Sequence, residues 1–209
     1  MYQILPAILM GGVATWFGVN RKKGVEYVKA AFPLYLFLLL LRSVWPGPSF
    51  LQGGVLVSLA LCTVADFLLG RPDNTSVFPF GLAGFLLGYL IYGVSFFQAI
   101  RPGGAFLYIA LVLGVVGILQ YRTLRTLPAS LRIPVVGYVA VVSFFLASAS
   151  THALQTGSPL PFLGALLIYL SDSLIAHNLF RSPLKQSDLW ILPPYYVGQI
   201  CIVLSVLGS

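Results

Sequence analysis

Asp66 and Asp172 each lie inside an apolar stretch long enough to cross a lipid bilayer. Their surroundings are alike, because residues 65–69 read Ala-Asp-Phe-Leu-Leu and residues 171–175 read Ser-Asp-Ser-Leu-Ile. A carboxylate at membrane depth is energetically costly, and proteins keep one there mainly for binding or proton transfer. These two aspartates therefore constrain both the fold and the function of the chain.

The composition is that of a polytopic helical membrane protein, because 58% of the 209 residues are hydrophobic and only 8% are charged. We expect an all-α bundle that forms one integral membrane domain over residues 1–209. A β-barrel is excluded, because its strands would alternate apolar and polar residues and these runs are apolar all round. The runs predict about eight spans, with seven as the alternative, near residues 2–19, 25–44, 51–70, 77–98, 103–120, 131–154, 158–180 and 188–207.

The net charge of +7 does not indicate a nucleic-acid partner, because the basic residues lie at the ends of spans. Only Arg42 and Arg101 flank the loops after even-numbered runs. Loops rich in lysine and arginine stay in the cytoplasm, so we expect extracytoplasmic termini and both aspartates in the cytoplasmic half of the membrane. The absence of a long tail favours a bacterial inner membrane over an organelle. The other basic residues follow odd-numbered runs: Arg21, Lys22, Lys23, Lys29, Arg71, Arg122, Arg125, Arg132, Arg181 and Lys185.

The two aspartate segments lie four predicted spans apart, as a parallel 4+4 repeat of a four-helix unit would place them. The alternative is that any two apolar helices share such short patterns. Cys62 and Cys201 both lie within spans and lack a CxxC partner, so neither a disulfide nor a thiolate metal site is expected.

The chain has no G-x-S-x-G, H-E-x-x-H or Walker motif, which excludes serine hydrolase, zincin and nucleotide-driven mechanisms. His152 and His177 fall at opposite membrane faces, so no metal site is expected. His177 either touches the site around Asp172 or simply ends its helix. Asp73 is predicted to lie in a turn, and Asp188 is predicted to be a helix N-cap.

Further polar residues gather toward the cytoplasmic half. Tyr195 and Gln199 lie one turn apart on one helix face, beside Tyr196. A phenol and an amide at membrane depth need hydrogen-bond partners. Tyr89 and Tyr92 follow a face of glycines that permits close helix packing, so the two tyrosines are either site residues or packing residues.

Lys29 lies at the cytoplasmic end of the second span, one turn after Glu26. Either the two form a local ion pair, or the lysine reaches toward the buried carboxylates or a phosphate.

Four segments carry a family resemblance: residues 59–69, the pattern Gly81-x3-Phe85-x2-Gly88-x3-Tyr92, residues 170–176 and residues 195–199. In this order and spacing the chain resembles the YhhN-type lysoplasmalogenase family of small eight-span membrane proteins. The resemblance covers essentially the whole chain. Two departures concern Tyr89, where the family often has histidine, and Lys29-Ala30, where it often has Lys-Pro. The first removes a candidate acid or base and leaves more of the chemistry to the aspartates.

The resemblance implies that the protein hydrolyses the vinyl ether bond of a lysoplasmalogen, which is a lysophospholipid. Its other expected partners are membrane lipids. The products would be a fatty aldehyde and a glycerophospho-alcohol, and no cofactor or metal is expected. Such a reaction needs an acid that protonates the alkene and an anion that faces the resulting oxocarbenium ion, a division of labour that glycosidases share. Asp66 and Asp172 would form this dyad, and we take Asp172 as the acid and Asp66 as the base, although the sequence does not distinguish them. The other expected substrate-binding residues are Lys29 for the phosphate, and Tyr92, Tyr195, Tyr196 and Gln199 for the water and the glycerol hydroxyl.

A proton-coupled transporter or a lipid-handling protein is the alternative, with the two aspartates as a proton relay. Very short loops and carboxylates near one membrane face favour a pocket that serves one leaflet, and hence an enzyme.

Overall fold

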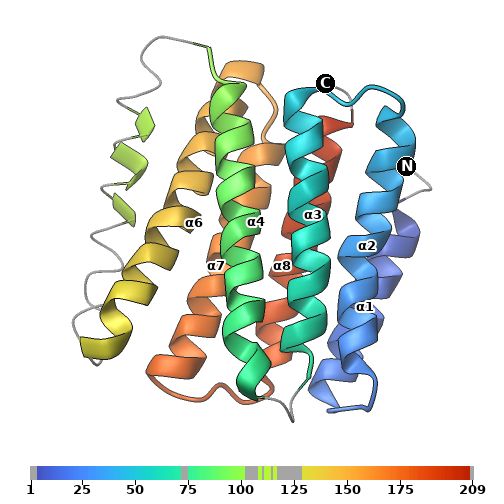
Figure 1. Cartoon of the computed structure of the whole chain (residues 1–209), viewed down its shortest axis with the longest axis vertical. Helices are drawn as coiled ribbons and strands as arrows, with labels where there is room; N and C mark the ends of the chain where they lie inside the picture. Colours follow the sequence, from blue (N-terminus) through green and yellow to red (C-terminus); the bar gives the residue numbers. More distant parts are fainter. Residues whose placement is uncertain are drawn as a thin grey trace.

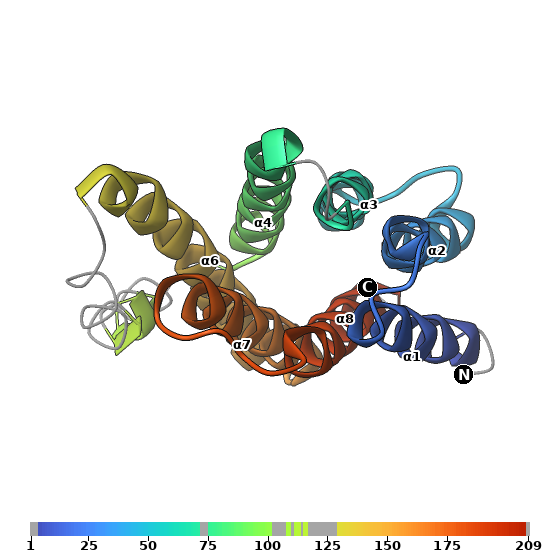
Figure 2. The ribbon, with the colours of Figure 1, turned by 90° about the horizontal axis from the view of Figure 1, so that it is seen from below.

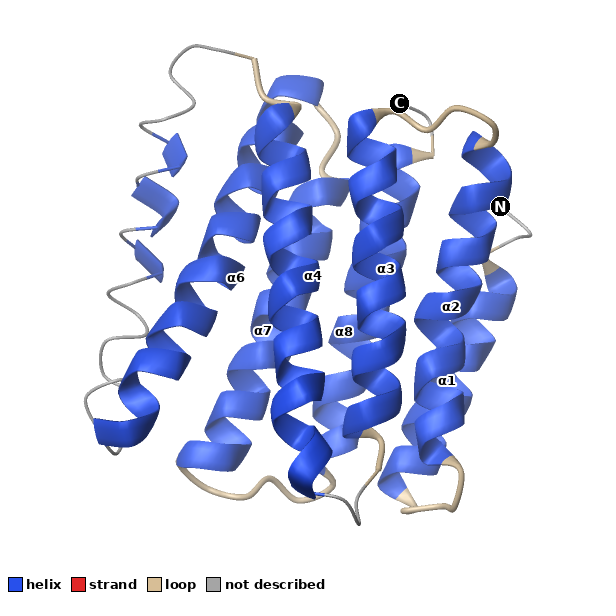
Figure 3. Ribbon diagram, in the orientation of Figure 1, coloured by secondary structure: helices blue, strands red, loops and turns tan. Residues whose placement is uncertain are grey.

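The structure is a computed structural model that describes residues 4–71, 75–101 and 129–207, with short helical pieces at 108–109, 111–113 and 115–116. Within these residues all regular structure is helical and no strand occurs, which confirms the all-α prediction (Figure 3). The elements are α1 (Leu5–Val19), α2 (Val25–Val44), α3 (Phe50–Leu69), η1 (Thr75–Val77), α4 (Phe78–Gln98), α6 (Ala129–Thr156), α7 (Leu160–Phe180) and α8 (Ser187–Val206).

The α-helices of the described ranges close into a ring whose order follows the chain. Each packs on the next, α4 packs on α6, and α8 returns to α1. Seen from below, α2, α3 and α4 form one row, and α1, α8, α7 and α6 form the other (Figure 2). Because α8 also contacts α3 across the ring, it touches both aspartate-bearing helices, α3 and α7.

Six of these helices, α2, α3, α4, α6, α7 and α8, are long and apolar enough to cross a membrane. The first, α1, is a shorter apolar helix of 15 residues. The bounds of all of them agree with the predicted runs to within a turn. The fifth run, near residues 103–120, falls largely outside the described residues, as does Asp73. The chain is thus a multi-pass membrane protein.

Helix direction alternates from α1 to α4 and again from α6 to α8, whereas α4 and α6 run the same way (Figure 1). As predicted, α3 and α7 run the same way, so Asp66 and Asp172 both lie toward the same end of the bundle. Arg42 lies in the last turn of α2 and Arg101 follows α4, and both helices end at the opposite side, where α8 also ends (Figure 1). We call the end toward which Asp66 and Asp172 lie the basic end. It carries Arg21, Lys22, Lys23, Lys29, Arg71, Arg132, Arg181 and Lys185.

Glycines let the aspartate-bearing helices pack closely on their neighbours. On α4, a Cβ at Gly88 would lie 3.4 Å from the sulfur of Cys62 on α3. Between α7 and α8, a Cβ at Gly164 would lie 2.9 Å from the carbonyl oxygen of Gly198, so the two backbones almost touch. Small residues at such crossings are typical of membrane helix packing.

The start of α8 differs from the sequence prediction for Asp188. The helix begins at Ser187, and its N-cap residue, Gln186, is in the left-handed conformation and makes no side-chain cap. Asp188 lies in the first turn, and its carboxylate forms an ion pair with Lys29 of α2. The N-cap prediction was wrong because local sequence rules do not account for a cation that arrives from another helix.

Candidate active site

Asp66 lies in a buried polar cluster where α3 meets α8 and α2. It is 5% exposed, and the hydroxyl of Tyr195 donates a hydrogen bond of 2.9 Å to its Oδ2. Lys29 of α2 is within electrostatic range of this carboxyl. The structure therefore brings together three residues that the sequence proposed separately.

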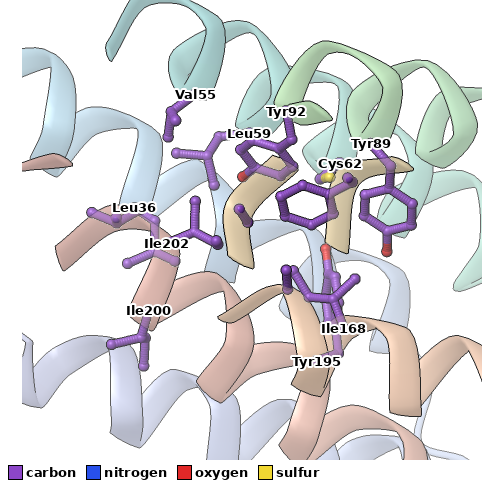
Figure 4. Packing of buried hydrophobic residues seen from close by; sticks show 14 of the residues in the cluster. Leu36, Val55, Leu59, Cys62, Tyr89, Tyr92, Ile168, Tyr195, Ile200 and Ile202 are labelled. Atoms are coloured by element: carbon purple, nitrogen blue, oxygen red, sulfur yellow. The ribbon is translucent and has the colours of Figure 1, made fainter. Parts of the chain in front are cut away.

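A second hydrogen-bonded group ties α8 to α3 and α4. The hydroxyl of Tyr92 donates to Gln199 Oε1 at 2.7 Å, and Gln199 Nε2 donates to Cys62 Sγ at 3.5 Å. All three residues are fully buried. The hydroxyl of Tyr195 points toward Cys62 (Figure 4). The face of α8 that carries Tyr195 and Gln199 thus finds the buried partners that its chemistry requires.

Asp172 lies on α7 and has a different tyrosine partner. The hydroxyl of Tyr138 on α6 donates a hydrogen bond of 3.1 Å to its Oδ2. The preceding residue, Ser171, donates to the carbonyl oxygen of Ile191 and so fixes α7 against α8. Sequence reasoning missed Tyr138, although a phenol inside an apolar run signals a buried hydrogen-bond partner.

The two carboxyls are connected through an aromatic cluster. In the described part of the chain no hydrogen bond joins Asp66 to Asp172. Tyr89 and Cys62 are each within electrostatic range of both carboxyls. Tyr89 is almost fully buried, and its ring packs edge-on against Tyr138 with 6.3 Å between centroids. It therefore serves packing and also lies close to both candidate catalytic groups.

An apolar cavity of about 330 Å³ lies between α4, α6 and α7. Most of its lining consists of aliphatic and aromatic side chains, among them Leu82, Phe85 and Ala176. Asp172 and its partner Tyr138 are part of this lining. A hydrocarbon chain placed here would lie directly against a carboxyl group.

A polar cavity of about 530 Å³ lies at the basic end, where the loop after α1 meets the end of α3 and the start of α8. Lys29 and Asp188 line it, and their Nζ and Oδ2 atoms are 3.2 Å apart. The lysine therefore pairs with α8 rather than forming the local pair with Glu26 that the sequence left open. Leu69 lines both this cavity and the apolar one.

Three other candidates lie apart from the hydrogen-bonded groups. Tyr196 packs on Phe32 of α2, with ring centroids 4.3 Å apart, and its buried hydroxyl has no hydrogen-bond partner. His177 interacts with Ser182 at 3.0 Å near the basic end. His152 packs against Phe96 toward the opposite end, so the two histidines are at opposite sides of the bundle as predicted (Figure 1).

The fold and the site define a class: a multi-pass helical membrane protein with two carboxyls held by tyrosines beside one apolar and one polar cavity. The sequence model of the YhhN family matches residues 27–206. The chain belongs to the YhhN family. The match includes both aspartates, all but the first two residues of α2, and the described helices from α3 to α8.

Several proteins similar to the chain over most of its length are lysoplasmalogenases. Lysoplasmalogenase TMEM86B of Sus scrofa is 30% identical over 198 residues, which cover 93% of this chain and 80% of the relative. The Homo sapiens protein of that name is 30% identical over 160 residues, which cover 76% of this chain and 64% of the relative. The Rattus norvegicus protein is 26% identical over 198 residues, covering 93% and 78%. No solved structure matches the chain significantly.

Proposed function

We propose that the protein hydrolyses the vinyl ether bond of a lysoplasmalogen, releasing a fatty aldehyde and a glycerophospho-alcohol. The observation that carries this proposal is the position of Asp172, a carboxyl group in the lining of a cavity that is otherwise suited to a hydrocarbon chain. The names of the similar proteins support the same reaction.

Asp172 is the general acid of the proposed reaction. Its carboxyl proton passes to the alkene carbon farther from the ether oxygen, and the alkene electrons form the new C–H bond. The neighbouring carbon and the ether oxygen then share the positive charge of an oxocarbenium ion. Because the alkenyl chain would lie in the apolar cavity, the carbon that accepts the proton is on the side of Asp172. General acid catalysis of this kind contributes roughly 10²- to 10⁴-fold in rate.

Asp66 is the general base. It takes a proton from the water that attacks the oxocarbenium carbon, which yields a hemiacetal. The hemiacetal hydroxyl then gives up its proton as the aldehyde carbonyl forms. The bond to the glycerol oxygen breaks with its electron pair on that oxygen, which takes up the proton. One water is consumed, and the proton that Asp66 gains balances the one that Asp172 loses. Tyr195 orients Asp66, and the hydrogen bonds of Gln199 with Tyr92 and Cys62 hold α8, which carries Tyr195, against α4 and α3.

The surroundings of the two carboxyls differ, as two roles require. Lys29 acts on Asp66 from α2, whereas Asp172 faces the apolar cavity. We further propose that the basic end faces the cytoplasm of a bacterium, so that the substrate enters from the inner leaflet of the inner membrane.

Aldehyde release by the purified protein in detergent tests this function. A lysoplasmalogen should yield one aldehyde per molecule, and the same lipid with a saturated ether should yield none, because it has no alkene to protonate. A carrier needs two compartments and a hydrolase does not. Folded protein that releases no aldehyde would refute the hydrolase and leave the proton-coupled carrier as the better reading.

A further inference from the structure

The polar cavity at the basic end contains charges of both signs. Arg21, Lys22 and Lys29 line it with Asp188, so three cations face one carboxylate, an excess of two positive charges. Arg21 and Lys22 belong to the loop between α1 and α2 and precede the residues that match the YhhN family, which begin at position 27. The family match therefore assigns no role to either cation.

The ion pair with Lys29 uses only one oxygen of the Asp188 carboxylate. The ion pair uses Oδ2, and the side chains of Lys29 and Asp188 keep 14% and 28% of their surface exposed. A second cation can therefore approach the remaining oxygen, Oδ1, from the cavity. Two cations in excess and one partly free carboxylate complement a zwitterion that joins a phosphate to an ammonium group.

The backbone around the cavity supports a binding role. In the described ranges, the non-glycine residues with left-handed φ angles are Arg21 at 47° and Gln186 at 53°, and both line this cavity. Such conformations cost free energy and gather at functional sites. The first turn of α8 also begins here without a side-chain N-cap.

Tyr196 supplies a further polar group near the cavity. Its hydroxyl is buried without a hydrogen-bond partner, and the residue is 3% exposed. It is within electrostatic range of both Asp66 and Asp188. A buried hydroxyl without a partner is costly unless a ligand or a water supplies the missing hydrogen bond.

The two cavities share Leu69, which lies one turn beyond Asp66 near the end of α3. A molecule with a charged head in the polar cavity can therefore extend its chain past Leu69 into the apolar cavity. The bonds between head and chain would then pass the region of the two aspartates.

We propose that the polar cavity binds the zwitterionic head group of a single-chain glycerophospholipid, with Arg21 and Lys22 on the phosphate, Asp188 on the ammonium, and the chain beyond Leu69 in the apolar cavity. This assignment rests on the proposed function, because it places that enzyme's substrate. It adds a loop outside the family match to the site and fixes which end of the lipid meets which aspartate.

Binding of unreactive lipids tests the assignment apart from catalysis. The first probe is a lyso-glycerophosphoethanolamine with a saturated alkyl ether chain, which cannot be hydrolysed at a vinyl ether. The second is the matching alkylglycerol, which lacks the phosphate and the ammonium. Dissociation constants and stoichiometry are measured on the purified full chain in detergent.

Arg21→Gln and Lys22→Gln should each weaken binding of the first probe by roughly fivefold and leave the alkylglycerol unaffected. Lys23→Gln is the matched control, because Lys23 belongs to the same loop and does not line the cavity, and it should change neither probe. Ala176→Phe, which fills part of the apolar cavity, should weaken both probes. We expect one lipid to bind per protein molecule, with an affinity that falls when either cavity is changed.

Asp188→Asn distinguishes a zwitterion site from a plain phosphate site. It should weaken binding of the phosphoethanolamine probe, because the carboxylate that faces the ammonium is lost. It should strengthen binding of the same lipid with a bare phosphate, because Lys29 is released from its ion pair. If Arg21→Gln and Lys22→Gln bind the first probe as tightly as Lys23→Gln does, the head-group assignment is wrong even where aldehyde release persists. Absence of aldehyde release with the expected binding pattern would instead refute the reaction alone.

Discussion

The hydroxyl of Tyr195 donates a hydrogen bond of 2.9 Å to the carboxyl of Asp66, across the contact between α8 and α3. Tyr138 and Asp172 repeat this arrangement between α6 and α7, at 3.1 Å. Each aspartate thus has a phenol from another helix, and the bundle must keep its helices in register for both bonds to form.

Replacing either phenol by a phenyl ring should slow the reaction without removing the carboxyl. We expect Tyr195→Phe and Tyr138→Phe each to lower kcat about tenfold and to destabilise the fold by about 1 kcal/mol, since one hydrogen bond to a buried group is lost. Tyr27→Phe is the control, because Tyr27 is 63% exposed. Steady-state kinetics and thermal unfolding in detergent measure both effects, and wild-type kcat in both phenylalanine variants would mean that neither phenol positions a reacting group.

The glycine crossing between α7 and α8 should be sensitive to a single methyl group. A Cβ at Gly198 would lie 2.8 Å from the carbonyl oxygen of Gly164, so Gly198→Ala must push the helices apart. We expect a loss of about 1–3 kcal/mol in stability and a fall in activity. Gly137→Ala adds the same methyl group where nothing lies within 4 Å and should be harmless. Equal unfolding temperatures for the two variants would contradict the close crossing.

The helices were predictable because a bilayer imposes one length on every span and the chain has almost no other apolar pattern. The shared face of Tyr195 and Gln199 was equally predictable, since it follows from the helical repeat alone. Both predictions depend on neighbours in sequence. They also required no knowledge of which helix faces which.

Contacts between distant helices were the part that the sequence did not reveal. Tyr138 and Asp172 are 34 residues apart, and Lys29 and Asp188 are 159 residues apart. Helices that are apolar all round carry little information about which face meets which neighbour. For that reason Tyr138 was missed and Asp188 was interpreted as a local cap.

The asymmetry of basic residues predicts the orientation of the chain. Eight of the ten cations assigned to the cytoplasmic loops lie in the described residues, all at the basic end, as the helix directions require. A reporter that is active only outside the cytoplasm should therefore be active when fused after Ser209, and a cytoplasmic reporter should be silent there. The opposite pattern would place both aspartates in the outer half of the membrane.

Activity should depend on pH with two limbs, because one carboxyl must be protonated and the other ionised. As pH falls the base gains a proton and turnover declines, and as pH rises the acid loses its proton and turnover declines again. The measurement is kcat/KM for aldehyde release across pH, with a chelator as a parallel test. A flat profile, or loss of activity with chelator, would argue for different chemistry.

Asp66→Asn and Asp172→Asn test the proposed pair most directly. Each keeps the size of the side chain and removes the carboxyl, so folding should survive, since an amide is less costly to bury than a charge. Turnover should fall by roughly 10²- to 10⁴-fold in each variant. Because the two groups act in one sequence of proton transfers, the double variant should be scarcely slower than the slower single one. Asp73→Asn, at a carboxylate predicted from the sequence to lie in a turn, should retain wild-type turnover. Well-folded Asp66→Asn and Asp172→Asn proteins with wild-type rates of aldehyde release would remove both aspartates from the reaction.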